Sequence, residues 1–302
     1  MDKIQKAGLT ELLKDSVAFN AAMSPYCTLR TGGSAEAICF IDDLSVLTRL
    51  ICFLDSEGLP WMAVGKGSNL LVTDKGVEGA VIILKGKLAE EINRDSSYRM
   101  TAGGGISIGK LLKYCVEHEL SGMEFMAGIP GTLGGAVIMN AGAYGEEIGD
   151  RIEKVRIVFP GGKTEELDHS QINFGYRKTS IPQKSVVYGV TLSLEKGKRE
   201  LIRERIENNI NRRKESQPLD MPSCGSVFKN PPGKYAAKLI EESELKGKII
   251  GGAMVSMKHA NFIVNTGNAT AGDIIELIAV IIKKVREDSG IVLETEVRVA
   301  GR

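Results

Sequence analysis

The feature that most constrains the fold of this chain is a run of glycines in an apolar segment. Residues 128–145 read GIPGTLGGAVIMNAGAYG, with six glycines among small apolar residues and no charged side chain. Glycine loses much conformational freedom on folding and packs no side chain, so such a run indicates positive φ angles or a group pressed close against the main chain. A tight turn would explain one pair of glycines, but six in one apolar window favour a ligand lying against a buried segment.

A second glycine-rich segment, GKGSNLLV (residues 65–72), follows a predicted strand. Its backbone N–H groups and short polar side chains can form a nest for an anion, although the same residues are common in ordinary turns. Two such cradles suit a ligand with a pyrophosphate between flat or sugar ends, which predicts a dinucleotide cofactor. The candidate residues in the two segments are Gly65, Gly67, Ser68, Asn69, Gly131, Thr132, Gly134 and Gly135.

Other phosphate-binding motifs are disfavoured. The stretch GGISIGKL places Gly104, Gly109 and Lys110 at P-loop spacing, but Leu111 stands where Ser or Thr would hold Mg²⁺. Gly109 and Lys110 also fall inside a predicted helix. No GxGxxG follows a strand and opens a helix with an acid about twenty residues later.

The composition is that of an ordinary globular protein. A chain of 302 residues with 43% hydrophobic residues predicts two or three domains, and a net charge of +1 gives no indication of a nucleic-acid partner. The five cysteines lack CxxC spacing and the three histidines form no local metal motif, so we expect a reduced chain without a metal site. The charged N-terminus lacks a signal peptide's apolar block, and no apolar run approaches the ~20 residues that span a bilayer. We therefore expect a soluble, cytoplasmic protein without a membrane partner; its oligomeric state stays open, a monomer included.

Apolar spacing and capping residues predict the helices. They are 44–54 (between Asp43 and Gly58), 107–120 (ended by Gly122), 199–216 (Ile202, Ile206 and Ile210 on one face) and 270–290 (Thr270 and Asp273 at its start, Gly290 at its end, and Ile274, Ile278, Ile281 and Ile282 on a buried side).

The predicted strands alternate with these helices without a regular βαβ rhythm, which favours a mixed α+β fold over a doubly wound sheet. A strand in residues 60–72 runs into the glycine turn, and further strands are expected in 79–86, 185–198 and 291–299. Residues 155–167 read as a hairpin closed by Gly161 and Gly162. In the last strand the alternation places Glu294, Glu296 and Arg298 on one face and Ile291, Leu293, Val297 and Val299 on the other.

Seven motifs in order, from residue 28 to the end of the chain, resemble those of the UDP-N-acetylenolpyruvoylglucosamine reductase family. They are TLRTGGSAEA, GKGSNLLV, GIPGTLGGAVIMNAGAYG, FGYRKTSIP, PSCGSVFKNP, HANFIVNTGNATAGDI and LETEVRVAG. The resemblance implies a two-subdomain FAD-binding fold of the vanillyl-alcohol-oxidase (PCMH) type and a C-terminal α+β substrate domain. With a boundary near Gly197, the expected domains are residues 1–86, 87–197 and 198–302.

The activity implied by the resemblance has two steps. NADPH reduces FAD and NADP⁺ leaves, after which hydride passes to UDP-N-acetylglucosamine enolpyruvate to give UDP-N-acetylmuramate for the bacterial cell wall. Two alternatives stay open: another FAD-dependent oxidoreductase of the same fold, such as an alcohol or sugar oxidase, and a nucleotide-binding protein without chemistry.

Hydride delivery to an enolpyruvyl double bond builds negative charge on the neighbouring carboxylate, so the site needs a cation and a proton donor. Arg177 can hold a carboxylate with its planar guanidinium, although the stretch itself suits a surface arginine equally well. Ser226 lies in a rigid Pro- and Gly-containing segment without a visible His–Asp partner. The resemblance makes Arg177 catalytic and Ser226 the proton donor, with Cys224 as an alternative donor.

The third catalytic residue implied by the resemblance is Glu296. Alternation alone would favour a solvated polar face here, and Glu294 is the competing acid. Relatives often carry a lysine directly before a Gln-Pro pair, whereas this chain has Ser216 there. The resemblance therefore implies that Lys214 or Arg213 helps to bind the UDP diphosphate in its place. The absence of a long tyrosine-bearing insertion implies the shorter subtype.

The remaining assignments follow the quoted motifs. The expected substrate ligands are Tyr176, Lys229 and Asn230, the last two for the UDP diphosphate. The expected FAD-binding residues are Gly65, Gly67, Ser68, Asn69, Gly128, Ile129, Pro130, Gly131, Thr132, Gly134, Gly135, Asn140 and Gly142.

Overall fold

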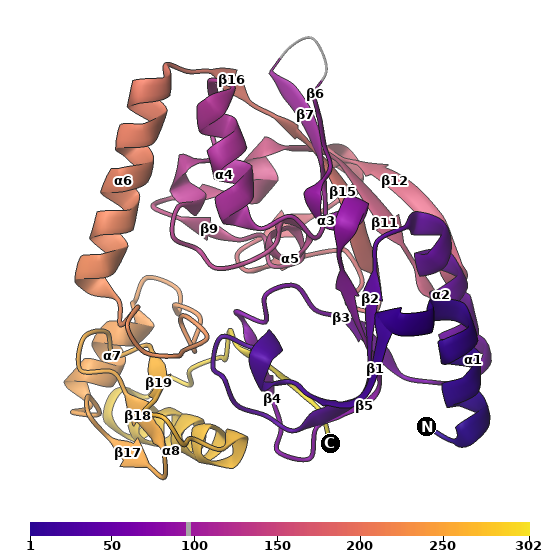
Figure 1. Cartoon of the computed structure of the whole chain (residues 1–302). Coiled ribbons are helices and arrows are strands. Elements are labelled where there is room, and N and C mark those ends of the chain that lie inside the picture. The colour runs from indigo at the N-terminus through magenta and orange to yellow at the C-terminus, as the bar shows by residue number, and fades with distance from the viewer. Residues whose placement is uncertain (95–97) are drawn as a thin grey trace. The chain divides into compact units, whose positions relative to one another are not determined.

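The computed structural model describes residues 1–94 and 98–302 and divides into two compact units. Unit 1 consists of Met1–Ala21, Glu36–Lys66 and Glu78–Asn211, and unit 2 of Ala22–Ala35, Gly67–Val77 and Arg212–Arg302 (Figure 1). Each unit is therefore built from segments that are distant in the sequence.

The first part of unit 1 is a four-stranded sheet in the order β1-β2-β5-β3, whose β3 and β5 run parallel. Its elements are α1 (Lys3–Leu13), β1 (Val17–Ala22), β2 (Ser34–Ile41), α2 (Leu44–Ser56), β3 (Trp61–Ala63), β5 (Val77–Leu84) and α3 (Gly86–Glu90). The predicted helix at residue 44 is confirmed: the Asp43 carboxylate accepts hydrogen bonds from the N–H groups of Ser45 and Val46, so α2 begins there. Its apolar side packs with strand residues such as Ile41 in one core.

The second part of unit 1 is a five-stranded antiparallel sheet in the order β12-β11-β15-β7-β6. Its strands are β6 (Ile92–Arg94), β7 (Arg99–Gly103), β11 (Ile152–Val158), β12 (Thr164–Asp168) and β15 (Val186–Ser193). The predicted hairpin is confirmed, since β11 and β12 pair around a turn in which Gly161 and Gly162 have φ angles of 72° and 75°. Such angles favour glycine.

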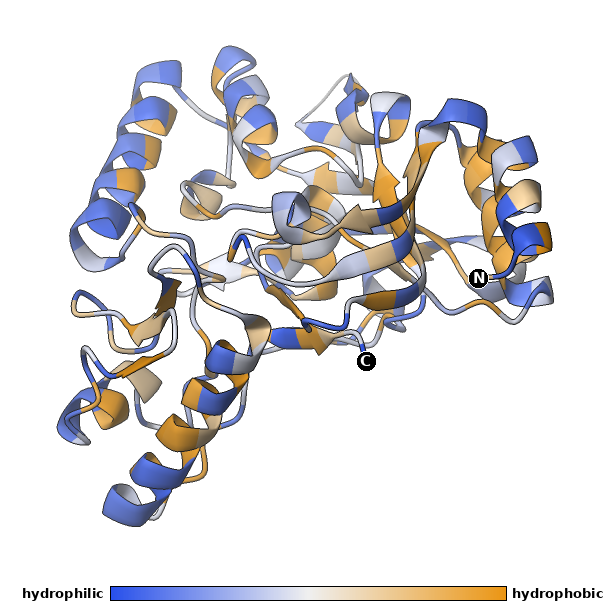
Figure 2. Ribbon diagram, turned by 60° about the horizontal axis from the view of Figure 1, so that its bottom comes forward, coloured by the Kyte–Doolittle hydropathy of each residue, from blue (hydrophilic) through white to orange (hydrophobic). Residues whose placement is uncertain are grey.

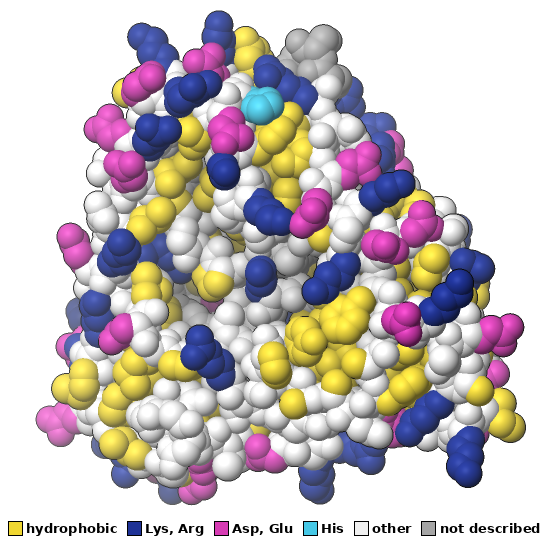
Figure 3. All heavy atoms as spheres, in the orientation of Figure 1, with side chains coloured by type: hydrophobic (Ala, Val, Ile, Leu, Met, Phe, Trp, Pro, Cys, Tyr) yellow, Lys and Arg dark blue, Asp and Glu magenta, His cyan; other side chains and the backbone are white. Residues whose placement is uncertain are grey.

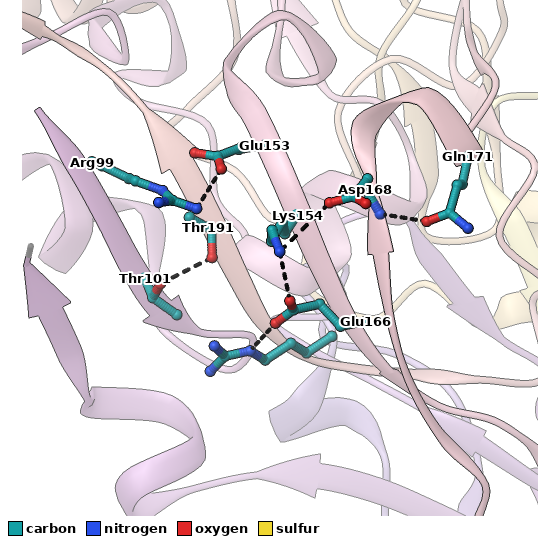
Figure 4. Close-up of polar contacts among 9 residues, drawn as sticks. Arg99, Thr101, Glu153, Lys154, Glu166, Asp168, Gln171 and Thr191 are labelled. Atoms are coloured by element: carbon teal, nitrogen blue, oxygen red, sulfur yellow. Dashed lines mark hydrogen bonds and ion pairs between the residues drawn. The ribbon is translucent and has the colours of Figure 1, made fainter.

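Alternation along these strands gives the sheet two different faces. Val155, Ile157 and Met100 belong to the apolar core, whereas the side chains between them form a polar ladder (Figure 4). In the ladder, Lys154 and Arg156 both donate to the Glu166 carboxylate, at 2.9 Å and 2.8 Å. On the apolar face lie α4 (Ile108–Glu117) and α5 (Leu133–Ile138), both of which contribute to the same core.

The helix predicted for residues 107–120 exists but ends earlier. The Ser107 hydroxyl caps α4, and Gly109 and Lys110 lie in its first turn, as the argument against a P-loop requires. The predicted end at Gly122 is wrong, because α4 stops at Glu117 and Glu119 takes the positive φ of 56°. The chain must turn at this point because the next residues, β8 (Leu120–Ser121), pair with β16 (Glu195–Lys196).

Unit 1 continues into α6 (Arg199–Ser216), the predicted charged helix. Ile202 is buried and Ile206 and Ile210 pack partly buried against the core, which confirms the apolar face. Figure 2 shows this two-sided pattern in several helices, with hydrophobic residues on one side and hydrophilic residues on the other. On the molecular face drawn in Figure 3, Lys and Arg are interspersed with Asp and Glu.

Unit 2 combines a three-stranded antiparallel sheet, two helices and a parallel strand pair. The elements are β17 (Ile249–Ile250), β18 (Ala253–Val255), β19 (Ile263–Asn265), α7 (Ala236–Glu242), α8 (Ala271–Ser289), and β4 (Leu70–Val72) beside β20 (Arg298–Ala300). The α8 prediction is confirmed: Thr270 and Asp273 form a capping box, Gly290 ends the helix with φ 72°, and the predicted isoleucine side faces the core. Within the described residues, no helix is both long enough and apolar enough to cross a membrane.

The strand predicted for residues 291–299 is mostly wrong. Only Arg298–Ala300 forms a strand, and Val299, expected on the buried face, is 53% exposed. The preceding residues are extended but bond to an irregular partner: Glu294 accepts from the N–H of Lys229, and the N–H of Glu296 donates to Val227. Because residues 227–229 are not a strand, no regular ladder forms.

Candidate active site

The glycine run of unit 1 wraps against a neighbouring stretch of main chain. The N–H of Gly134 donates to the Gly104 carbonyl at 2.7 Å, and the N–H of Ile108 to the Gly131 carbonyl at 3.1 Å. A Cβ atom at Gly134 would lie 2.9 Å from the Val187 carbonyl oxygen. The chain's own packing therefore favours glycine at position 134, and its contact with FAD stays a prediction.

Other residues of this run leave an open surface. A Cβ atom at Gly65 would lie 2.3 Å from Thr132 Oγ1, so residues of the two predicted cradles meet within unit 1. The absent side chain of Gly135 instead faces outwards, with only Thr132 Oγ1 near it at 3.3 Å, and Gly128, Pro130 and Gly135 are exposed. This side-chain-poor surface fits the apolar or sugar part of a dinucleotide.

The second cradle has unused backbone donors. Gly67 has φ 59°, and its carbonyl accepts the Thr28 N–H at 3.3 Å. Within the part of the chain that the structure describes, the N–H groups of Gly67 and Ser68 donate no hydrogen bond, nor do those of the preceding Gly65 and Lys66. Free N–H groups at consecutive residues are what an anion-binding nest offers.

Asn140, predicted to bind FAD, is completely buried. Its Nδ2 donates to Glu147 at 2.6 Å and to the Gly175 carbonyl at 3.1 Å, while its Oδ1 accepts from the Gly149 N–H at 3.0 Å. The side chain is thus enclosed by protein, and its contact with FAD stays a prediction. Asn140 fixes the loop beside Gly175.

Arg177 lies in the two-residue turn between β13 (Phe174–Gly175) and β14 (Lys178–Thr179). Its φ is 57°, a region that arginine adopts only at a conformational cost, and strained residues of this kind cluster at functional sites. The guanidinium donates to the Gly142 carbonyl at 3.1 Å and lies 5.1 Å from the Tyr176 ring centroid. Three predicted site residues therefore meet in unit 1.

Ser226, in unit 2, is partly buried and precedes a clamped pair of residues. The Asn261 main-chain carbonyl accepts from the Val227 N–H at 2.8 Å. The Asn261 side chain accepts from the Phe228 N–H at 2.9 Å and donates to the Phe228 carbonyl at 2.8 Å. Asn261 is only 4% exposed, so it acts as a rigid support for the Ser226 segment. The sequence analysis did not identify Asn261 as a support. The available signal was a polar residue between apolar residues in the segment HANFIVN.

The backbone brings Glu296 next to the same segment. The Glu296 N–H donates to the Val227 carbonyl at 2.7 Å, and the Glu296 carbonyl accepts from Asn69 Nδ2 at 3.0 Å. The competing Glu294 is 73% exposed in its side chain and pairs with Lys229. The partly buried Glu296 is therefore better placed than Glu294 to act beside Ser226.

Cys224 is a poor alternative donor. It is 3% exposed, and burial, with smaller contributions from the negative charge of Glu296 and from Cys27, raises the pKa of its thiol to about 12. A thiol with this pKa stays protonated, but its burial keeps it from a substrate, whereas Ser226 is partly exposed.

Two of the predicted diphosphate ligands have side-chain partners within unit 2. Lys229 pairs with Glu294, and the Asn230 Oδ1 accepts from the Ala236 N–H at 3.0 Å at the start of α7. A ligand would have to compete with these contacts or add to them.

The chain matches two family models and a set of related reductases. The family model "UDP-N-acetylenolpyruvoylglucosamine reductase, C-terminal domain" matches residues 217–300, and the model "FAD binding domain" matches residues 35–168. A UDP-N-acetylenolpyruvoylglucosamine reductase of Caldanaerobacter subterraneus subsp. tengcongensis is 42% identical over 97% of each chain. The chain belongs to the UDP-N-acetylenolpyruvoylglucosamine reductase family.

Two further relatives agree with this family membership. The reductase of Syntrophotalea carbinolica is 40% identical over 98% of each chain. The crystal structure of the reductase from Thermus caldophilus is similar with a TM-score of 0.80 and 36% identity, covering 94% of this chain and 98% of that one. The resemblance and the α+β fold class, an FAD-binding domain of the PCMH type followed by the reductase family's C-terminal domain, are thus confirmed.

Proposed function

We propose that this protein reduces UDP-N-acetylenolpyruvoylglucosamine to UDP-N-acetylmuramate with FAD as cofactor and NADPH as reductant, a step in peptidoglycan precursor synthesis. The observation that carries the proposal is 42% identity to a reductase of this name over 97% of both chains. The N–H groups of Gly67 and Ser68 suit the phosphates of FAD, and the open surface at Gly128, Pro130 and Gly135 suits its remainder.

FAD bound here and reduced by NADPH would supply the hydride for the enolpyruvyl carbon. Arg177 holds the substrate carboxylate, on which negative charge develops, with its permanently charged guanidinium. The Ser226 hydroxyl donates the proton to the neighbouring carbon, and Glu296 restores that proton or stabilises the intermediate. Tyr176, beside the Arg177 guanidinium, binds the substrate, and Lys229 and Asn230 bind the diphosphate.

The enzyme works in the cytoplasm, where it contributes to cell shape, cell division and the cell cycle through its product. Residues 1–86 and 87–197 act as the two FAD-binding subdomains. Residues 198–302 act as the substrate domain, completed by the segments that pack with it in unit 2.

A visible spectrum under anaerobic conditions tests the proposal. The purified protein should show a flavin band that NADPH bleaches and that the enolpyruvyl substrate restores. An alcohol or sugar oxidase would instead be bleached by its alcohol or sugar and restored by oxygen with release of hydrogen peroxide. A protein without a flavin band that binds no added FAD would contradict both enzyme assignments.

A further inference from the structure

The guanidinium of Arg298 has no carboxylate partner among the described residues. It is partly buried on β20, and its main-chain N–H donates to the Asn69 carbonyl at 3.1 Å. Among the residues that the structure describes, no carboxylate pairs with its guanidinium, and the guanidinium donates no hydrogen bond. Burial lowers the pKa of this group, with no opposing contribution from a nearby acid.

An unpaired cation that is partly removed from water is unfavourable unless another group neutralises it. The cost of removing an ion from water grows with its burial, and proteins normally offset this cost with a counter-charge and hydrogen bonds. The polar ladder of unit 1 illustrates the usual arrangement, since Lys154 and Arg156 share the Glu166 carboxylate there. Arg298 lacks this arrangement, which indicates that its counter-charge comes from outside the chain.

The neighbours of Arg298 point to the nature of that anion. In the parallel pair of β20 and β4, Arg298 stands opposite Leu70, which directly follows the turn containing Ser68 and Asn69. The unused N–H groups of Gly67 and Ser68 are therefore within the same short stretch of unit 2. Backbone N–H groups and a planar guanidinium are two groups that proteins commonly use to bind phosphate oxygens.

We propose that Arg298 is a cofactor-binding residue that, together with the Gly67 and Ser68 N–H groups, binds the pyrophosphate of FAD. The proposal rests on the proposed FAD dependence and assigns a role to a residue that sequence alternation placed only on a polar face. A guanidinium can donate two parallel hydrogen bonds to a phosphate, so it adds orientation as well as charge.

Titration of flavin-free protein with FAD and, separately, with ADP tests this role, because ADP carries the pyrophosphate without the flavin. Arg298→Gln should weaken both ligands about 10- to 100-fold, the range expected for a lost charge-assisted contact. Arg298→Lys should lose less, because it keeps the charge. The FAD affinity of Arg298→Gln should also fall less steeply with added salt than that of the parent. Arg286→Gln is the matched control, an exposed arginine of α8 in the same unit.

Thermal unfolding of the flavin-free variants separates this role from a structural one. Removing an unpaired, partly buried cation should leave the midpoint of Arg298→Gln unchanged or raise it, whereas loss of a structural contact would lower it. A lowered midpoint, an unchanged affinity for FAD and ADP, or an effect confined to the KM of the UDP-sugar would overturn the proposal. A parent protein that binds no FAD would contradict the proposed function instead.

Discussion

At the scale of single residues, the site depends on a few side chains whose partners lie far away in the sequence. Asn261 supports the Ser226 segment, Asn69 holds the Glu296 carbonyl, and Asn140 fixes the loop beside Gly175. The motifs predicted two of these asparagines only as ligands, because a one-dimensional pattern does not reveal which groups an amide faces. Burial and hydrogen bonding show that they also act as supports.

The Ser226→Ala variant should separate proton delivery from flavin reduction. FAD binding and flavin reduction by NADPH should stay near the parent's, because neither step needs the serine proton. Turnover of the enolpyruvyl substrate should fall by roughly 10²–10⁴-fold, as expected for the loss of a positioned general acid. Stopped-flow measurements of the two half-reactions check this.

Ser226→Cys is the matched control, since a thiol at the same position can donate a proton and should recover part of the rate. Equal impairment of both half-reactions in Ser226→Ala, or of neither, would remove Ser226 from the donor role. Cys224 would not be the substitute, because it is buried.

Asn261→Ala should act on the Ser226 segment from a distance. It leaves the N–H and carbonyl of Phe228 without their partners, which should cost about 1–3 kcal/mol of unfolding free energy. The kcat of the second half-reaction should fall while the rate of flavin reduction by NADPH stays unchanged. Asn265→Ala, which removes another buried asparagine of unit 2 that holds the Leu29 carbonyl, is the control for stability loss alone. If both variants lose the same stability and neither loses turnover, Asn261 has no positioning role.

At the scale of secondary-structure elements, local signals were sufficient where a segment carries its own caps and periodicity. Helices α2 and α8 begin at the predicted residues because Asp43 caps α2 and Thr270 and Asp273 form a capping box at the start of α8. The C-terminal strand was predicted too long because residues 294–297 bond to the irregular residues 227–229. No local sequence pattern predicts this long-range pairing.

Ile278→Asp should destabilise unit 2 strongly. Ile278 is 7% exposed on α8, and a charge placed there without a partner should cost several kcal/mol, or the carboxyl should stay protonated at a smaller cost. Ile275→Asp makes the same chemical change on the same helix at a side chain that is 40% exposed, and it should have a much smaller effect. Equal midpoints of thermal unfolding in the two variants would contradict the placement of α8.

Asp55 links α2 to the β11–β12 turn through a set of hydrogen bonds. Burial opposes its ionisation, but donors on Lys184, Gly161 and Trp61 outweigh burial and lower the pKa of its carboxyl. Because the folded-state pKa is below the unfolded value of about 3.9, the charged form stabilises the fold above that pH and this contribution is lost as pH falls through the folded-state pKa.

Asp55→Asn should therefore lower the unfolding free energy by roughly 1–3 kcal/mol at pH 7. The difference from the parent should shrink as the pH falls below about 4. Urea unfolding at several pH values checks both statements. A difference that grows towards low pH would mean that the carboxyl is not stabilised in its charged form.

At the scale of the whole molecule, unit 2 is not one continuous stretch of chain. Residues 22–35 contribute Leu29 and Thr31, which bond to Asn265 and to Ala269, and residues 67–77 contribute β4 and Asp74, whose carboxylate accepts from two N–H groups at the start of α8. The motifs indicated the order of the domains but not these crossings, because crossings are a property of three-dimensional packing.

A fragment of residues 212–302 should therefore fail to fold alone. It lacks the partner of β20, the Asp74 cap of α8 and the acceptor for Asn265. Circular dichroism should show no cooperative thermal transition in the fragment, while the full chain gives one. A cooperative transition in the fragment would show that residues 22–35 and 67–77 are dispensable for unit 2.

The pairing of β4 with β20 also has a consequence during synthesis on the ribosome. Leu70 pairs with Arg298, so 228 further residues must be polymerised before β4 meets its neighbour (298 − 70 = 228). At roughly 5–20 residues per second this takes on the order of 10–50 s. Throughout that interval one edge of an apolar strand is available to other nascent chains, and the cell has to shield it until the ribosome has finished the far end of the polypeptide.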